Sequence, residues 1–380
     1  MADLAVMLAK VVVAFGALML LAAYMTWAER RVFALVQVRY GPNRVGPAGL
    51  LQPIADGIKL MFKESVIPAQ ADKLIFVLAP LVSLVPAMAA FAVIPFGSSV
   101  TLFGRQVDLI VADVNVGVLY IFALSGIGVY GIVLGAWASN SKYPLLGGLR
   151  SAAQLISYEL SLGMSLLGVV LIAGSLSLKD IVAAQANYPF ILLQPLGFLL
   201  FLVCMLAETN RAPFDLVEAE QELVGGFHTE YTGVRFAMFF LAEYMNMVTM
   251  SAIAVTLFLG GPSGPRIDFW PHIWPVVWFF LKLSIFIFMY FWLRATLPRL
   301  RYEQLMDFGW RVLIPASILW LGAVAVFRVG NDEDWPLAIT LPAVVVGALG
   351  IMGFLWLSMP RRDPVTRRDI TSPREVKRSG

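Results

Sequence analysis

Residues 113–139 read DVNVGVLYIFALSGIGVYGIVLGAWAS, and no charged residue follows Asp113 until Lys142. About 20 apolar residues in a helix cross roughly 30 Å of hydrocarbon, so this stretch predicts a membrane-spanning helix. Eight similar stretches surround it in a chain that is 59% hydrophobic and 14% charged, with a mean hydropathy of +0.79. The nine predicted spans are residues 4–27, 74–96, 113–139, 151–174, 189–207, 234–260, 271–293, 312–330 and 337–359.

The sequence therefore predicts an all-α polytopic integral membrane protein, with eight core transmembrane helices and a ninth at the C-terminus. Only residues 331–335 separate the last two spans, so a re-entrant hairpin is the alternative there. No basic n-region or small-residue cleavage site accompanies the first span, which indicates a retained helix rather than a signal peptide.

Three glycines of the third span, Gly126, Gly128 and Gly131, match the G-x-G-x-x-G pattern of dinucleotide sites. That motif requires a preceding strand and an acidic residue about 20 positions later, and neither is present. Gly135 follows Gly131 after four residues, a spacing that favours close packing of transmembrane helices.

The distribution of basic residues predicts the orientation, because loops rich in Lys and Arg stay in the cytoplasm. Loops after odd-numbered spans, together with the tail, hold 22 of the 28 Lys and Arg residues. This predicts one transmembrane domain, residues 1–360, with a periplasmic N-terminus and structured cytoplasmic loops at 29–73 and 208–233. The basic tail, residues 361–380, is predicted to lie in the cytoplasm against anionic lipid headgroups rather than to bind nucleic acid.

One cysteine, Cys204, and two histidines, His228 and His272, supply no ligand set for zinc, haem or an iron–sulfur cluster. We therefore expect no metal site and no cofactor bound by this chain, and any redox centre should belong to a partner.

The first cytoplasmic loop contains a predicted amphipathic helix. Leu51, Ile54, Ile58 and Met61 share one face, and Asp56, Lys59 and Lys63 lie opposite. Two interpretations remain open: a helix that rests on the headgroups, or one whose apolar face roofs a lateral opening for a lipid-soluble substrate.

The second loop concentrates acidic residues in AETNRAPFDLVEAEQELVGGFHTEY, residues 207–231. Its carboxylates are Glu208, Asp215, Glu218, Glu220, Glu222 and Glu230. Pro213 suits the first position of a helix and Gly225 its end, which predicts about three helical turns. Closely spaced carboxyl groups titrate together and can pass protons, whereas the alternative is an acidic face that docks a basic partner.

Two further acids, Glu159 and Glu243, lie inside predicted spans. A charge there costs about 2.5 to 3.5 kcal/mol even on lenient scales, so each is expected to face a cavity or a partner, or to be protonated. Lys282 also lies within a span, where a pairing with a carboxylate is one interpretation, although the sequence does not identify that carboxylate.

Five segments together resemble one family. They are residues 29–64 (ERRVFALVQVRYGPNRVGPAGLLQPIADGIKLMFKE), 157–162 (SYELSL), 207–231, 240–247 (FLAEYMNM) and 297–306 (LPRLRYEQLM). The chain resembles the quinone-site membrane subunit of proton-pumping NADH:quinone oxidoreductase, respiratory complex I, which is called the H subunit in bacteria. The resemblance covers residues from about 5 to 330. Many members of that family end after eight spans, so the ninth is a departure from it.

The resemblance implies a protein that catalyses nothing in isolation but forms most of the tunnel by which quinone reaches a cluster held by a neighbouring chain. The implied tunnel residues are Glu29, Arg30, Arg39, Asp56, Phe227 and Arg294. The implied proton path to the pumping subunits comprises Glu159, Glu208, Asp215, Glu218, Glu220, Glu222, Glu230 and Glu243.

The same resemblance implies quinone as the substrate, with FMN and iron–sulfur clusters in partner subunits. The implied partners are quinone-site subunits of the peripheral arm, small membrane-arm subunits and membrane lipid, and the implied location is a bacterial inner membrane. Two other functions remain as alternatives: the equivalent subunit of a membrane-bound hydrogenase, and a stand-alone cation transporter, although no repeated halves with broken helices are evident.

Overall fold

The computed structural model describes residues 2–102, 105–216, 224–265, 269–270 and 272–333, together with residues 347, 350, 353 and 354. Seven apolar helices within these ranges are long enough to cross a membrane. They are α1 (Ala2–Val36), α3 (Lys73–Ala90), α4 (Gly117–Ala138), α5 (Lys142–Ala173), α10 (Gly233–Phe258), α11 (Trp274–Thr296), and the run of α12 (Tyr302–Phe308), the π-helix η4 (Gly309–Leu313) and α13 (Ile314–Asp332). The prediction of an all-α, multi-pass membrane protein is confirmed.

The fifth predicted span, residues 189–207, is interrupted. It forms a single turn, α7 (Phe190–Leu193), and then the apolar helix α8 (Pro195–Glu208), which has 14 residues. At 1.5 Å per residue α8 is about 21 Å long, which is shorter than the hydrocarbon layer. Pro195 causes the break, because it has no N–H group and disfavours helical backbone at Gln194. The Gln194 side-chain amide donates a hydrogen bond to the Gly168 carbonyl at 2.8 Å.

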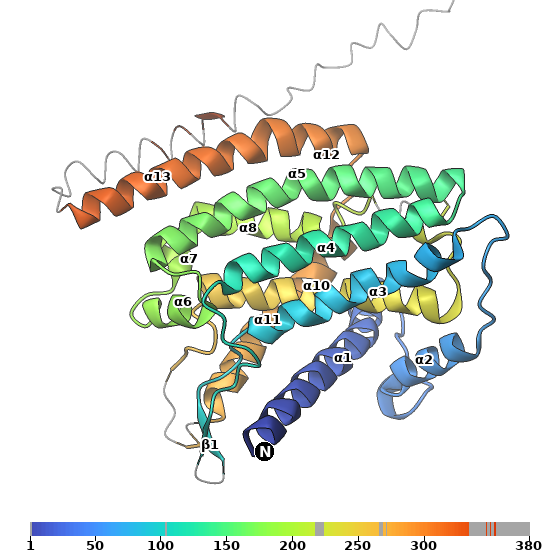
Figure 1. The fold of residues 1–380 in the computed structure, drawn as a ribbon, viewed down its shortest axis with the longest axis horizontal. Helices are drawn as coiled ribbons and strands as arrows, with labels where there is room; N and C mark the ends of the chain where they lie inside the picture. The colour runs from blue at the N-terminus through green and yellow to red at the C-terminus, as the bar shows by residue number, and fades with distance from the viewer. Residues whose placement is uncertain are drawn as a thin grey trace, which may run out of the picture.

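Helix α10 occupies the centre of the bundle. Figure 1 shows it running beside α3, α4, α5 and α8, while α1 and α11 cross at a steeper tilt. Every residue of α10 from Met247 to Phe258 is buried. A helix that is apolar on all sides is stable only when other helices cover all of it, so α10 forms the core on which the outer helices pack.

The N-terminal helix α1 extends past the predicted end of the first span, and the following loop folds back onto it. Residues 29–36 are therefore helical rather than part of a loop. Arg30 pairs with Asp56 of α2 (Gln52–Phe62) at 2.8 Å, and Arg31 donates to the Ala48 carbonyl in η1 (Pro47–Gly49) at 2.6 Å. The amphipathic helix α2 is confirmed, and its apolar residues Ile54, Ile58 and Met61 are exposed.

Helices α3 and α4 pack closely through Gly131. A Cβ atom at Gly131 would lie 2.7 Å from the Ser83 backbone nitrogen and 2.9 Å from the Ala79 carbonyl oxygen, so only glycine fits. The predicted packing role is confirmed there and at Gly135, where a Cβ would lie 3.1 Å from the Phe239 ring. Gly128 differs, since no atom lies within 4 Å of its added Cβ.

The end of the bundle that carries α2 is called the α2 end below. There, Tyr231 packs against α3. Pro80 lies inside α3 and has no N–H group, which leaves the Phe76 carbonyl without its helical donor. The Tyr231 hydroxyl donates to that carbonyl at 3.2 Å, and the two rings stack at 4.1 Å. Burial raises the pKa of Tyr231. The segment before it forms the short helix η3 (Gly226–His228).

The opposite end, called the hairpin end, carries strands β1 (Val100–Leu102) and β2 (Arg105–Val107), which pair antiparallel with Thr101 opposite Gln106. The short helices η2 (Phe91–Val93) and α6 (Leu178–Ala184) also lie there. Lys179 forms ion pairs with Asp108 at 3.0 Å and Asp113 at 3.7 Å, and the hydrogen bond from Lys179 to Asp108 raises the pKa of Lys179.

The interpretation that Lys282 pairs with a carboxylate is wrong. Its ammonium group donates to three backbone carbonyls, those of Leu259 at 2.7 Å, Gly261 at 3.0 Å and Ser263 at 2.6 Å. These carbonyls follow the C-terminus of α10, where helical donors are lacking and the helix dipole favours a cation. Lys282 therefore caps α10 from α11.

The C-terminal described helices pack along α5. The Trp310 indole of η4 donates to Ser157 Oγ at 3.1 Å, and the Tyr158 hydroxyl donates to the Leu305 carbonyl at 2.9 Å. These contacts flank Glu159 on α5. The ninth predicted span, residues 337–359, falls almost wholly outside the described residues, and the basic tail 361–380 lies entirely outside them.

Candidate functional site: a buried ion-pair network beside carboxyl groups without cations

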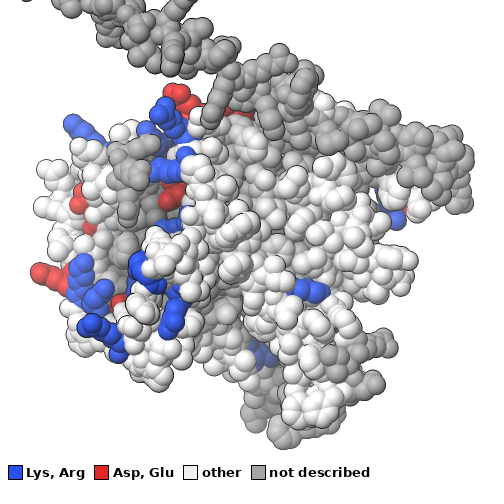
Figure 2. Space-filling model, turned by 180° about the vertical axis from the view of Figure 1, so that it is seen from behind, with Lys and Arg blue, Asp and Glu red and all other residues white. Residues whose placement is uncertain are grey.

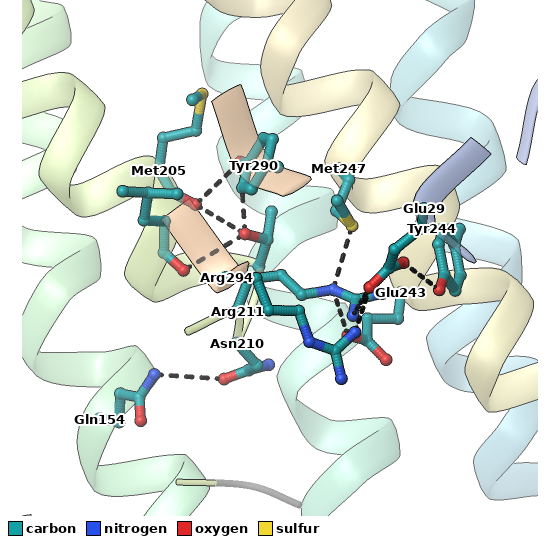
Figure 3. A network of polar contacts seen from close by, with 12 residues as sticks. Glu29, Gln154, Met205, Asn210, Arg211, Glu243, Tyr244, Met247, Tyr290 and Arg294 are labelled. Carbon is teal, nitrogen blue, oxygen red and sulfur yellow. Dashed lines mark hydrogen bonds and ion pairs between the residues drawn. The ribbon is translucent and has the colours of Figure 1, made fainter. Parts of the chain in front are cut away.

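Arg211 lies at the centre of a polar network at the α2 end of the bundle (Figure 3). Its Nε atom is 2.8 Å from Glu243 Oε1 of α10, and its Nη1 atom is 3.5 Å from Glu29 Oε1 of α1. Arg294 of α11 also pairs with Glu29 Oε1, and the Tyr244 hydroxyl donates to Glu29 Oε2. Three long helices and the turn after α8 thus meet at one site.

The network is balanced in charge and mostly buried. Two guanidinium groups face two carboxylates, and the side chains of Arg211 and Glu29 are only 4% and 5% exposed. Arg211 also lies over the Tyr244 ring, 4.6 Å from its centroid, and 3.1 Å from Met247 Sδ. A buried ion that loses its partner is strongly destabilising, so these charges are mutually dependent.

The turn that carries Arg211 is held by Gln154 of α5. The fully buried amide of Gln154 donates to the Ala207 carbonyl at 2.9 Å and to the Phe214 carbonyl at 2.8 Å. Both carbonyls therefore point toward α5. The predicted helix start at Pro213 is wrong, since residues 213–216 are not helical, and residues 217–223 of the predicted helix lie outside the described residues.

Glu208, at the end of α8, has a different environment from the network. It is buried, and its Oε1 atom accepts a hydrogen bond from Ser125 Oγ of α4. Its Oε2 atom is buried with no hydrogen-bond partner, and no ion pair to Glu208 is found among the residues that the structure describes. Another acid, Glu159, is close enough to interact with it electrostatically.

A cavity large enough for several water molecules joins Glu208 to the ion-pair network. Its volume is about 60 Å³, and its lining includes Ser125, Glu208, Phe227, His228, Glu243 and Asn246. Polar side chains from α4, α8, η3 and α10 therefore converge on one space. Carboxyl groups that share a hydrated cavity can exchange protons through it.

Glu159 lies on the outer side of this region, between α4 and α5. It is half-buried and lines a groove of about 620 Å³ whose other lining residues include Phe122, Ile156, Leu160 and Leu167. A Cβ at Gly126 would lie 3.4 Å from Glu159 Oε1, so this glycine leaves room for the carboxyl group. Glu159 thus faces both the interior acid Glu208 and an apolar surface groove.

Comparison with known proteins identifies the family. A family model described as NADH dehydrogenase matches residues 9–325. An H subunit of NADH-quinone oxidoreductase from Geobacter metallireducens is 56% identical over 317 residues, which cover 83% of this chain and 94% of the relative. The H subunit from Frankia alni is 54% identical over 355 residues, which cover 92% and 79%. The chain belongs to the H-subunit family of NADH-quinone oxidoreductase.

Membership of the H-subunit family makes the chain part of an enzyme complex whose other subunits are its partners. A further relative, an H subunit from Syntrophobacter fumaroxidans, is 54% identical over 327 residues, which cover 83% of this chain and 97% of the relative. These matches favour complex I over the hydrogenase and transporter alternatives.

The tunnel residues predicted from the family resemblance lie in separate places. Glu29 and Arg294 belong to the ion-pair network, and Phe227 lines the cavity beside Glu208. Arg30 and Asp56 pair where α1 meets α2. The exposed Arg39 contacts Gln37 instead, with its Nε 2.6 Å from Gln37 Oε1.

The acids predicted to form a proton path are only partly brought together. Glu208 and Glu243 line one cavity, and Glu159 lies beside Glu208. Asp215 and Glu230 are half-buried in the turns that flank this site. The three remaining acids, Glu218, Glu220 and Glu222, lie outside the described residues.

Three residues of the site were missed by sequence reasoning: Arg211, Ser125 and Asn246. Arg211 carried a usable signal, because it is the one basic residue among the six carboxylates of the acidic loop. Ser125 and Asn246 carried none, since small polar residues are common in transmembrane helices and only packing brings these two into the cavity.

Proposed function

We propose that this protein forms most of the quinone-access tunnel of complex I and an acidic path that couples quinone reduction to proton translocation. The observation that carries the proposal is the buried Glu208 carboxyl group, which has no cationic partner among the described residues and adjoins a polar cavity shared with Glu243. A fixed charge in such a place is costly, whereas a group that gains and loses a proton is suited to it.

The quinone part of the proposal is supported by α2. Its apolar residues are exposed, so a lipid-soluble molecule would meet an apolar surface on the face of α2 opposite Asp56, which pairs with Arg30 of α1. In the proposal, the guanidinium groups of the ion-pair network then orient the polar headgroup. Ubiquinone and menaquinone both fit this chemistry.

The coupling part follows from electrostatics. Quinone reduction supplies negative charge and takes up protons, with electrons from FMN and iron–sulfur clusters held by peripheral-arm subunits. At an effective dielectric constant of 20, a unit charge 4 Å away is worth about 4 kcal/mol, which is enough to change the protonation of a carboxyl group. Glu243, Glu208 and Glu159 then form a sequence from the network to the α4–α5 groove, where a small membrane-arm partner would receive the proton.

The proposed orientation places the α2 end in the cytoplasm of a bacterial cell and the N-terminus in the periplasm. Figure 2 shows Lys and Arg gathered at the α2 end, while most of the remaining surface seen in that view is uncharged. Basic residues at one end favour the cytoplasmic side of an inner membrane, and the tail 361–380 would add to them at the anionic headgroups.

A Glu159→Gln variant of the whole complex, reconstituted in vesicles, tests the proposal. We expect slower quinone reduction by NADH and weaker vesicle acidification, while electron transfer to a water-soluble acceptor that bypasses quinone is retained. The matched control is Asp307→Asn, which removes an exposed carboxylate that pairs with Arg311 at 3.3 Å on α12. Wild-type acidification by Glu159→Gln would remove this acid from the path.

A further inference from the structure

A second cavity continues from the first toward the hairpin end. It has a volume of about 30 Å³, and both cavities are lined by Ser83, Ser125, Gly128, Glu208 and Asn246. Helices α3, α4 and α10 enclose the two cavities. Glu208 lies where they adjoin, so its carboxyl group borders space on both sides.

The two cavities follow one face of α10. Phe239, Ala242, Glu243 and Asn246 line the first, and Asn246, Thr249, Met250 and Ile253 line the second. From Phe239 to Ile253 the helix rises about 21 Å, a large part of the membrane thickness. The second cavity ends among Ala90, Ile121 and Ile253, so its far end is apolar.

Two residues that line the smaller cavity each have a buried polar atom without a hydrogen-bond partner among the described residues: Glu208 Oε2 and Thr249 Oγ1. Thr249 contrasts with its neighbours on α10. Ser251 donates to the Met247 carbonyl at 2.7 Å, and Thr256 donates to the Ala252 carbonyl at 2.8 Å. A hydrogen bond to the carbonyl four residues earlier is common for a hydroxyl group in a transmembrane helix. The Thr249 hydroxyl does not use its helix in this way.

Water matches the chemistry and size of this space. A buried polar atom that lacks a hydrogen bond is costly, and a cavity of about 10 to 15 Å³ or more can hold a water molecule when polar groups line it. The smaller cavity has room for about two such molecules. Glu208, Thr249 and Asn246 provide the polar side chains that a bound water needs.

We propose that the smaller cavity is a water-binding site in which ordered water joins the carboxyl group of Glu208 to the hydroxyl of Thr249. This site lies beyond Glu208, on its hairpin-end side. The role of the water rests on the proposed function: it extends the proton exchange of Glu208 away from the quinone side, as a branch distinct from the one toward Glu159. Thr249 positions the water and does not itself change protonation.

The test uses the purified whole complex with Thr249→Val, which keeps the shape of the side chain, and Thr249→Ser as the matched control, which keeps the hydroxyl. A cryo-electron microscopy map that resolves water in the larger cavity should show water between Glu208 and Thr249 in the wild type and in Thr249→Ser. Thr249→Val should lose it. A wild-type map that resolves water beside Glu243 but none beside Thr249 would overturn the site.

Infrared difference spectra supply a readout that simple loss of packing would not produce. The carboxyl C=O band that disappears in Glu208→Gln belongs to Glu208, and it should shift to higher frequency in Thr249→Val because one hydrogen bond is lost. Thr249→Ser should leave the band in place. An unshifted band in Thr249→Val would contradict a water bond between the two side chains.

The experiments can refute the water site and the proposed function independently of each other. If Glu159→Gln acidifies vesicles normally, the proposed path is wrong, but the water site stands on the density and the C=O band. If Thr249→Val loses the water yet acidifies vesicles at the wild-type rate, the site stands and the branch is wrong.

Discussion

Glu29 and Glu208 are both buried carboxyl groups, but their surroundings differ. Glu29 contacts Arg211, Arg294 and Tyr244 and therefore carries a compensated charge. Glu208 contacts the Ser125 hydroxyl, interacts electrostatically with another acid and borders two cavities. The same residue type is thus used once as a fixed structural charge and once where a proton can come and go.

The largest expected effect comes from removing the cation shared by two acids. In Arg211→Met, Glu243 loses its ion pair at 2.8 Å and Glu29 loses one of its two cationic partners. Breaking a buried pair costs about 3 to 5 kcal/mol. We expect little assembled complex in the membrane, measured by immunoblot of native gels. Arg311→Met, at the exposed pair between Arg311 of η4 and Asp307 of α12, is the control and should assemble normally; equal assembly of both variants would contradict a structural role for Arg211.

The comparison itself is tested by a pair of matched substitutions. Glu29→Gln removes charged contacts with two guanidinium groups and should lower stability by about 2 to 3 kcal/mol. Glu208→Gln keeps the shape of a group that has no cation to lose, so its stability cost should stay below about 1 kcal/mol. Thermal unfolding of the solubilised complex gives the order, and a larger cost for Glu208→Gln would reverse our assignment of the two carboxyl groups.

A smaller effect is expected for Tyr244→Phe. The variant loses the hydroxyl that donates to Glu29 but keeps the ring under Arg211. A hydrogen bond to a charged group contributes about 1.5 to 3 kcal/mol, and the remaining partners of Glu29 should hold the loss near the lower value. The same unfolding assay measures it. A loss as large as that of Glu29→Gln would mean that Tyr244, rather than the two arginines, keeps Glu29 buried.

The smallest effect is expected for Lys179→Gln, because this residue forms exposed rather than buried ion pairs. Lys179 forms ion pairs with Asp108 and Asp113 at the hairpin end, where both partners of the shorter pair are about half exposed. Lys179→Gln should cost less than about 1 kcal/mol. Because the pKa of Lys179 is raised on folding, the contribution is fully present below the pKa of the unfolded chain, about 10.4, and is lost only above it. A cost that changes between about pH 6 and 9 would contradict this assignment.

The spans show how far apolar runs predict helices. Seven of them became long helices because length and hydropathy alone determine whether a segment can cross a membrane. The fifth did not, because Pro195 disfavours helical backbone at Gln194 and the helix restarts after it. Pro195 was a local signal for this break, whereas the bond from Gln194 to the Gly168 carbonyl, 26 positions away, was not predictable from local sequence.

In the acidic loop, the sequence motif indicated the family, but the local sequence pattern did not predict the backbone structure. Its residues carried the family resemblance and pointed to Glu208, yet its local pattern wrongly placed a helix start at Pro213. Local propensity could not anticipate that Gln154, more than 50 residues earlier, would bind both ends of the turn. Lys282 gave a similar error, because a carboxylate is the usual partner of a buried cation but three carbonyls past the end of α10 were nearer.

By itself the amino-acid sequence determined that the chain is a helical membrane protein, where most of its spans lie and which family it belongs to, because hydropathy and motifs are properties of contiguous residues. Only the tertiary structure decided which carboxyl groups meet a guanidinium group and which border a cavity. Arg211, Glu29 and Glu243 are distant in the chain, and a charge in a low-dielectric interior depends on the few atoms that packing places within about 4 Å of it.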